Sequence, residues 1–119
     1  KVAGIAGVIC DGPVRDVVES RDLDFPVFAR SATPTTARGR IVEEAFDEPV
    51  EIGDVTVRPG DYVIADASGV VFVAQDRADE IVKTAEKIAA REAAMTRDVL
   101  AGKPVSQVMD ADYENMLDE

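Results

Sequence analysis

The chain opens with a short apolar run of small residues over positions 2–9 (VAGIAGVI), which the turn pair Asp11-Gly12 closes. A continuous apolar run of this length between turn residues is typical of a buried strand. Because this core-like sequence starts directly after Lys1, we expect a single domain over residues 1–119 that lacks its N-terminal part. The chain would then be the C-terminal part of a larger domain.

A short helix is predicted directly after this strand. Pro13 suits the first turn of a helix, with the preceding Asp-Gly pair as its cap. The valines that follow form an apolar stripe that reaches about Arg21. Beyond it, residues 25–29 (FPVFA) predict a second strand, and the Ser, Thr and Pro residues over 31–36 predict a loop.

From Val50 the pattern changes to that of a β meander, in which short strands alternate with turns rich in Gly, Asp and Pro. The predicted strands cover residues 50–52, 55–57, 62–66 and 70–74. The turns between them lie at Gly53-Asp54, at residues 58–61 and at residues 67–69.

From Asp76 the apolar spacing becomes helical, and this long helix is predicted to run to Leu100 and to stop at Gly102-Lys103-Pro104. The acidic tail over residues 105–119 would hold a short last helix. Strands followed by a long C-terminal helix predict the α/β fold class.

Composition and charge exclude several classes of function. The hydrophobic content of 46% supports a folded core, and the net charge of −11 without a basic stripe excludes the usual nucleic-acid partner. The chain has no apolar stretch long enough to cross a membrane and no basic-then-apolar leader. Cys10 cannot form an intramolecular disulfide, because it is the only cysteine. We expect a cytoplasmic protein with no membrane partner.

The sequence contains no histidine, which excludes Ser-His and Cys-His nucleophile pairs and imidazole metal ligands. Any catalysis must therefore depend on carboxylates. The richest segment is Arg15-Asp16-Val-Val-Glu19, which follows the first predicted strand. Oxygen ligands such as Asp16 and Glu19, three residues apart on one helical face, suit Mg²⁺ or Mn²⁺. Arg15 offers a planar fork for a substrate carboxylate.

An ordinary structural interpretation competes with this one. Arg15 and Glu19 could form an i,i+4 ion pair on the helix surface, with Asp16 at the helix start. Spacing alone favours this second interpretation. Cys10 is expected to be a small buried residue. Arg30 and Arg38 could line the mouth of the site, but simple surface exposure is the favoured interpretation.

Four motifs resemble the family named for regulator of ribonuclease activity A (RraA-like), which includes 4-hydroxy-4-methyl-2-oxoglutarate aldolases. They are DGPVRD at residues 11–16, FPVFAR at 25–30, VRPGD at 57–61 and ADASGVV at 65–71. The resemblance covers nearly the whole chain. It implies a swivelling β/β/α-type domain and a trimer or hexamer with active sites between subunits.

The resemblance also implies an activity and roles for single residues. The family's motif places the substrate carboxylate on Arg15 and a divalent metal on Asp16, with Glu19 as the third member. A neighbouring subunit would contribute a catalytic glutamate from the late helix, for which Glu92 is the match. A glycine-containing loop that helps to bind substrate would lie before Lys1, so either the chain is a fragment or a separate chain supplies this loop.

The expected enzyme is a metal-dependent (class II-type) lyase that cleaves 4-hydroxy-4-methyl-2-oxoglutarate-type 2-oxo acids to pyruvate. Stabilisation of the pyruvate enolate would also permit oxaloacetate decarboxylation. The alternative is a non-catalytic regulator that binds a ribonuclease or another basic protein through its acidic surface. An inactive remnant that keeps the motif only for helix capping is a third hypothesis.

Overall fold

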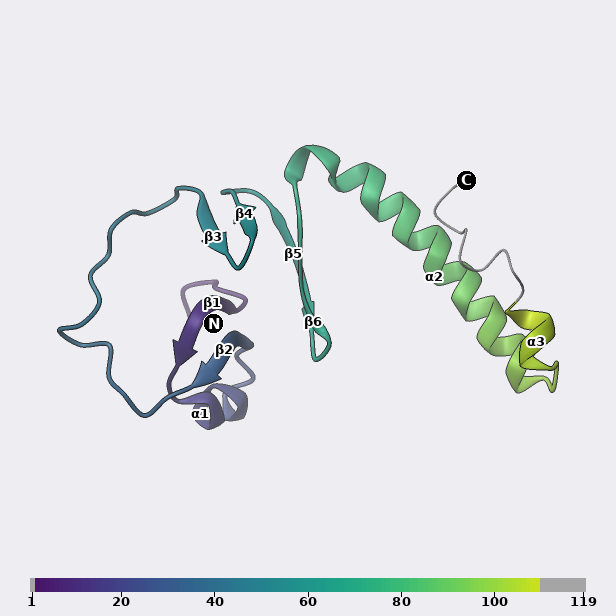
Figure 1. Ribbon diagram of the computed structural model, residues 1–119, viewed down its shortest axis with the longest axis horizontal. Coiled ribbons are helices and arrows are strands. Elements are labelled where there is room, and N and C mark those ends of the chain that lie inside the picture. Colours follow the sequence, from purple (N-terminus) through teal and green to yellow (C-terminus); the bar gives the residue numbers. More distant parts are fainter. Residues whose placement is uncertain (1, 110–119) are drawn as a thin grey trace. The chain divides into compact units, whose positions relative to one another are not determined.

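The computed structural model describes residues 2–109 of the chain, which divides into two compact units, Lys1–Gln75 and Asp76–Glu119. The first unit carries strands β1 to β6 and the short helix α1, and the second carries the helices α2 and α3 (Figure 1). This confirms the predicted mixture of strands and helices with a long helix late in the chain.

The first unit is built on a parallel pair of strands. Strand β1 (Val8–Val14) pairs in parallel with β2 (Val27–Ala32), and α1 (Val17–Asp22) forms the connection between them. Parallel neighbours need such a crossover, because a tight turn can join only antiparallel strands. Helix α1 contacts β2 and lies beside the pair in Figure 1. The carboxyl ends of both strands therefore meet at one edge.

The observed bounds of β1 and β2 differ from the predicted ones. Strand β1 continues through the Asp11-Gly12-Pro13 segment that was predicted to end the strand and start a helix, and α1 begins only at Val17. Strand β2 likewise extends to Ala32, into the predicted loop. The reason is non-local: the two strands supply each other with hydrogen-bond partners, which outweighs the local preference for a turn.

The pairing of β1 with β2 contains one irregularity. Cys10 pairs with Ala29 and Pro13 with Ser31, so that two residues of β1, Asp11 and Gly12, lie opposite the single residue Arg30. Such an extra residue is a β-bulge, which bends its strand and changes the direction of the side chains that follow.

The side chain of Asp11 bridges this bulge to a distant segment. One carboxylate oxygen accepts a hydrogen bond from Nε of Arg30 on β2, and the other accepts one from the backbone N–H of Gly53 at 2.9 Å. The Gly53 hydrogen bond, followed by the Arg30 side chain, holds the pKa of Asp11 below its ordinary value of 3.8. Asp11 thus joins β1 to β2 and to the β3–β4 turn, and it is not the predicted helix cap.

Two hairpins complete the first unit. The strands β3 (Val50–Ile52) and β4 (Val55–Val57) pair across the predicted Gly53-Asp54 turn, where Gly53 has a φ of 65°. The strands β5 (Tyr62–Asp66) and β6 (Gly69–Val73) pair across a turn at Ala67-Ser68.

The expected meander is wrong in one respect. Each hairpin is its own two-stranded sheet, and among the strands described β4 and β5 are not neighbours. The segment between these two strands turns instead around Asp61. Its carboxylate accepts hydrogen bonds from the backbone N–H groups of Arg58 at 2.8 Å and Gln75 at 3.2 Å.

The second unit is dominated by α2 (Ala78–Leu100), which follows a 3₁₀ turn at Gln75–Arg77. The helix ends as predicted: Gly102 has a φ of 93°, and its N–H donates to the carbonyl oxygen of Val99 at 3.0 Å. The short helix α3 (Val105–Val108) confirms part of the predicted last helix, and residues 110–119 lie outside the described part. No helix within residues 2–109 is long and apolar enough to cross a membrane.

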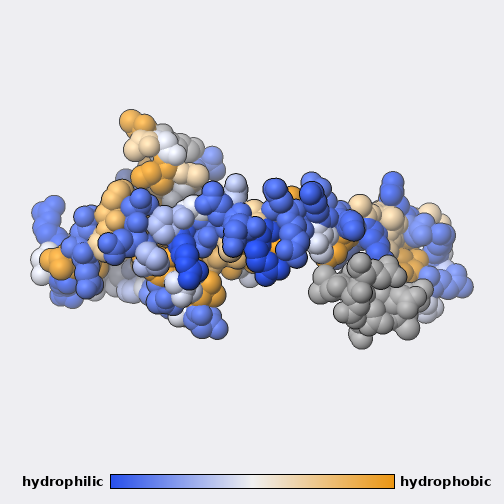
Figure 2. All heavy atoms as spheres, turned by 90° about the horizontal axis from the view of Figure 1, so that it is seen from above, coloured by the Kyte–Doolittle hydropathy of each residue, from blue (hydrophilic) through white to orange (hydrophobic). Residues whose placement is uncertain are grey.

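Few side chains are buried. Within residues 2–109 the buried apolar residues are Val73 in the first unit and Ala78 in the second. Figure 2 shows apolar residues at the surface, among hydrophilic ones. On the β5–β6 hairpin, for example, Ile64 and Val71 are exposed. Exposed apolar faces of this kind mark surfaces suited to packing against other protein.

Gly7 marks a close approach that can be tested. A Cβ atom at this position would lie 2.9 Å from the backbone carbonyl oxygen of Pro26, which accepts a hydrogen bond from Val8 and cannot move freely. Gly7→Ala should lower the free energy of unfolding by about 1–3 kcal/mol. At Gly12 a Cβ would meet only the sulfur of Cys10 at 3.7 Å. Gly12→Ala is therefore the control, and equal unfolding midpoints for the two variants would refute the prediction.

The Asp11 bridge predicts a pH effect. Since the pKa of Asp11 is lowered in the folded state, its contribution to stability is complete above the unfolded-state pKa. That contribution is lost as the pH falls through the folded-state value, in a window below 3.8. The backbone amide of Gly53, followed by NMR, should titrate in this window, and Asp11→Asn should abolish the titration. A midpoint at or above 3.8 in the wild-type protein would contradict the bridge.

Candidate functional site

The candidate site lies where β1 and β2 end. An open concavity of about 620 Å³ is formed there by the last residues of both strands, the start of α1 and the loop after β2. Its lining includes Val14, Asp16, Glu19, Asp22, Ala32 and Thr33. The carboxyl ends of parallel strands are the usual place for ligands in α/β folds, because the loops there leave the sheet without covering it.

Asp16 is the junction between strand and helix. It is the N-cap residue of α1, and its carbonyl oxygen accepts the first helical hydrogen bond, from the N–H of Ser20 at 2.9 Å. Its backbone is left-handed, with a φ of 57°, a conformation that costs a non-glycine residue about 1–3 kcal/mol. The side chain makes no cap hydrogen bond. Asp24 and Asp47 also have a positive φ, so this conformation alone does not mark a functional residue. The carboxylate of Asp16 is a candidate because it lines the concavity and does not cap its helix.

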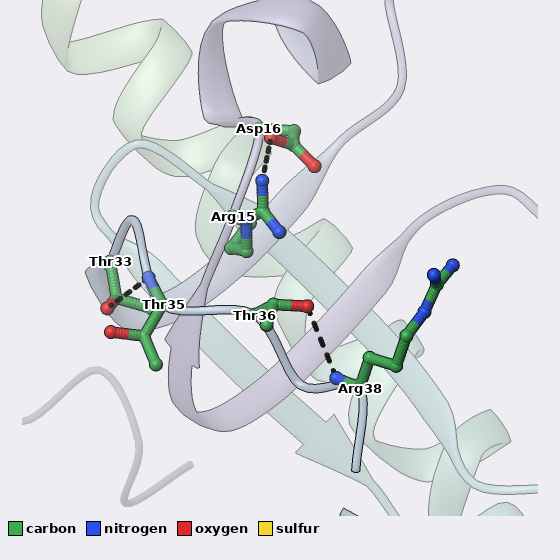
Figure 3. Close-up of polar contacts among 6 residues, drawn as sticks. All are labelled: Arg15, Asp16, Thr33, Thr35, Thr36 and Arg38. Atoms are coloured by element: carbon green, nitrogen blue, oxygen red, sulfur yellow. Dashed lines mark hydrogen bonds and ion pairs between the residues drawn. The ribbon is translucent and has the colours of Figure 1, made fainter. Parts of the chain in front are cut away.

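Arg15 faces this carboxylate. Its guanidinium lies 3.6 Å from a carboxylate oxygen of Asp16, and Figure 3 shows the two side chains directed at each other. The side chains are 45% and 61% exposed. An ion pair in this position contributes only about 0–1 kcal/mol to stability. Both groups therefore remain accessible to a ligand at little cost.

Glu19 lies one turn further on, in the first turn of α1, and lines the same concavity as Asp16. Asp16 and Glu19 thus line one concavity, and Arg15, which is outside the lining, pairs with Asp16. Asp16 lies at the start of the helix, as the ordinary interpretation has it. Among the described residues, however, the ion pair of Arg15 is with Asp16, and no i,i+4 pair with Glu19 is formed.

The donor set fits some metals better than others. Within the described residues, no group of three or more Asp, Glu, Cys or His side chains is placed to hold one ion. Asp16, Glu19 and Asp22 all line the concavity, and Asp16 and Glu19 are the two carboxylates at the start of the helix. Mg²⁺ is commonly held by one or two carboxylates together with water and substrate oxygens, so these residues suit a weakly chelated Mg²⁺ or Mn²⁺.

The loop after β2 supplies residues that the sequence patterns did not reveal. The N–H of Thr33 donates to the carbonyl oxygen of Val14 at 2.9 Å, which ties the ends of the two strands together. The hydroxyls of Thr33 and Thr36 accept hydrogen bonds from the N–H groups of Thr35 and Arg38, at 3.2 and 3.3 Å (Figure 3). One sequence signal could have identified Thr33. It directly follows β2, and the carboxyl end of β2 lies at the same edge as that of β1.

The remaining predicted residues lie elsewhere. Glu92 is on α2 in the second unit, where it lines a hollow with Met95, Val99 and Met109. Its catalytic role stays a prediction. Cys10 is a half-buried free thiol on β1. Arg30 and Arg38 are exposed, as expected. Arg30 also forms the bridge to Asp11, which the sequence patterns did not predict.

A comparison with protein families places the first unit in a family. Residues 1–72 match the sequence model of the RraA-like family, described as Aldolase/RraA. The match covers β1 to β5, β6 up to Phe72, the concavity and the residues that bond to Asp11.

Relatives from several organisms agree with this match. An uncharacterized protein of Methanocaldococcus jannaschii is 33% identical over 92% of this chain and 52% of its own length. A protein of Halalkalibacterium halodurans named "Putative 4-hydroxy-4-methyl-2-oxoglutarate aldolase" is 33% identical over 85% of this chain and 50% of its own. The same name belongs to a Deinococcus radiodurans protein that is 46% identical over 56% of this chain and 41% of its own.

A solved structure shows the same fold. An uncharacterized protein from Pseudomonas syringae pv. tomato superposes with a TM-score of 0.85 at 30% identity, over 88% of this chain and 52% of that one. The chain spans about half the length of the curated relatives it matches. The family model matches more than half of the chain, and the chain therefore belongs to the RraA-like family.

Proposed function

We propose that this chain carries the site of a divalent-metal-dependent lyase that cleaves 4-hydroxy-4-methyl-2-oxoglutarate-type 2-oxo acids to pyruvate. The observation that carries the proposal is the edge at the ends of β1 and β2, where Asp16 and Glu19 line one concavity and Arg15 pairs with Asp16. The aldolase names of two relatives support the reaction class.

Arg15 would bind the substrate. Its guanidinium is planar and partly exposed, and it can hold a carboxylate through two parallel hydrogen bonds. Binding the carboxylate of a 2-oxo acid in this way fixes the direction of the bond to be cleaved. The neighbouring Asp16 keeps the guanidinium at the edge of the concavity.

Asp16 and Glu19 would hold the metal. When bound, a divalent cation supplies Lewis-acid stabilisation of the negative charge that develops as the C–C bond breaks. The two carboxylates carry the opposite charge to the cation and leave further positions to water and substrate. With no histidine in the chain, proton transfer depends on carboxylates or on water. The same charge stabilisation would serve oxaloacetate decarboxylation.

The proposal includes an assembly. We propose the family's swivelling β/β/α arrangement, as part of a larger domain, in a trimer or hexamer or in a complex with a chain that supplies the upstream loop. Glu92 would then act from a neighbouring subunit. Two observations support this assembly. The hairpins expose apolar side chains, and the chain spans only about half the length of its relatives.

A second candidate is binding to a protein partner without catalysis. The loop between β2 and β3 exposes apolar side chains, among them Val42 at 86% and Phe46 at 85%. Acidic residues flank them, namely Glu43, Glu44, Asp47 and Glu48. This combination suits a partner surface that is basic and partly apolar. A protein that shows no lyase activity with any metal would favour this alternative.

Metal dependence is the first test of the lyase. The protein, purified with any chain that co-assembles with it, should lose pyruvate release in EDTA and regain it with Mg²⁺ or Mn²⁺. The assay would use 4-hydroxy-4-methyl-2-oxoglutarate and, separately, oxaloacetate. Full activity in the chelator would exclude this mechanism.

Substitutions of Arg15 and Asp16 should change the kinetics in different ways. Arg15→Lys keeps the charge but loses the bidentate fork, so KM should rise by about 10-fold or more with metal affinity nearly unchanged. Asp16→Asn tolerates the left-handed backbone but removes the ligand charge, so metal affinity and kcat should fall and high metal concentration should restore part of kcat.

Matched controls exist for both substitutions. Asp47 is an exposed aspartate with the same φ of 57°, so Asp47→Asn controls for the loss of one charge in this backbone conformation. Arg21 lies on α1, close to the site in sequence, so Arg21→Lys controls for the replacement of an arginine by a lysine. If Arg15→Lys and Asp16→Asn behave like these controls while the protein binds substrate and metal normally, the site lies elsewhere.

A further inference from the structure

The bulge in β1 lies between the bridge and the proposed site. Asp11 and Gly12 form the bulge, and Val14 ends the strand two residues later, directly before Arg15 and Asp16. The bulge is fastened at Asp11, by Arg30 and Gly53. The end of the strand is fastened at Val14, by the N–H of Thr33.

We propose that Asp11 and Arg30 are positioning residues, which hold the β1 bulge and so set the direction in which Arg15 and Asp16 leave the strand. The inference deepens the proposed function and rests on it for its link to metal and substrate.

The side chains of a strand repeat with a period of two residues. Successive side chains alternate between the two faces of a sheet, so a shift of one residue moves every later side chain to the opposite face. Before the bulge, Cys10 pairs with Ala29, and after it Pro13 pairs with Ser31. Without the extra residue, the segment from Pro13 to Asp16 would move by one position relative to β2.

The bonds of Asp11 to Arg30 and Gly53 lie where they can hold the bulge and so keep this register. Arg30 is the residue of β2 opposite the bulge, so its bond to Asp11 keeps the extra residue out of the regular ladder. The hydrogen bond from Gly53 holds the second oxygen of the same carboxylate. Because Gly53 has a φ of 65° in the β3–β4 turn, its N–H direction is fixed by that turn.

Exposure argues against a purely stabilising role. The side chain of Arg30 is 64% exposed and that of Asp11 is 30% exposed, and ion pairs near the surface stabilise a fold only weakly. Neither residue lines the concavity that holds Asp16. Both line a separate hollow between the parallel strands and the hairpins, with Ile52, Asp54 and Phe72. They would therefore act on the site through the backbone.

The experiment uses Asp11→Asn, Arg30→Gln and the double variant in the full chain, with any co-assembling chain present. Asparagine offers a single acceptor oxygen, so one of the two donors loses its bond. Asp61→Asn is the matched control, because Asp61 also bridges two backbone N–H groups but does not touch β1. The measurements are backbone amide NMR shifts, affinity for Mn²⁺ alone, and the unfolding midpoint.

The expected result is a change of the Arg15 and Asp16 amide shifts and an affinity for Mn²⁺ about 10-fold weaker, with an unfolding midpoint close to that of Asp61→Asn. The effects of the two substitutions should be less than additive in the double variant, since Arg30 acts through Asp11. If Asp11→Asn does not fold, Arg30→Gln carries the test, because it leaves the Gly53 bond in place.

Two outcomes separate this inference from the proposed function. If the wild-type protein does not bind Mn²⁺, the proposed metal site fails, and the amide shifts alone decide whether the bridge positions Arg15 and Asp16. Unchanged Arg15 and Asp16 shifts in folded Asp11→Asn and Arg30→Gln variants would overturn the inference, whatever the affinity for Mn²⁺.

Discussion

The parallel pairing of β1 with β2 is the constraint on which the site depends. Hydrogen bonds fasten it at both ends, from Val8 to Pro26 and from Thr33 to Val14. Helix α1 has six residues, too few to be stable alone in water, and so it depends on its contact with the strands. A change that separates the strands would remove the edge, the helix start and the concavity together.

The sequence predicted the local features of the fold well. The turn at Gly53, the turn before Tyr62 and the end of α2 each depend on a glycine with positive φ and a polar neighbour, and such signals lie within a few residues of each other. The bounds of β1 could not be predicted in this way. The partners of Asp11 are 19 and 42 residues away in sequence, and no local pattern shows them.

The site was predicted by residue type more than by geometry. Resemblance to the family selected Arg15, Asp16 and Glu19, and in the structure Asp16 and Glu19 line one concavity while Arg15 pairs with Asp16. The left-handed backbone of Asp16 and the contribution of Thr33 follow from how strand, helix and loop meet, which periodicity does not encode. Each hairpin has only two strands, and a sheet of this size is marginally stable in isolation. The proposed site therefore depends on the proposed assembly, which would supply packing partners for the hairpins.

The left-handed backbone at Asp16 also limits which residues suit this position. Glycine, asparagine and aspartate are the residues that adopt this conformation most readily, and aspartate alone among them carries a negative charge. If Asp16 holds the proposed metal, asparagine or glycine at this position would remove the ligand charge and still allow the strand-to-helix junction to form. The fold and the proposed chemistry therefore place separate demands on this one position.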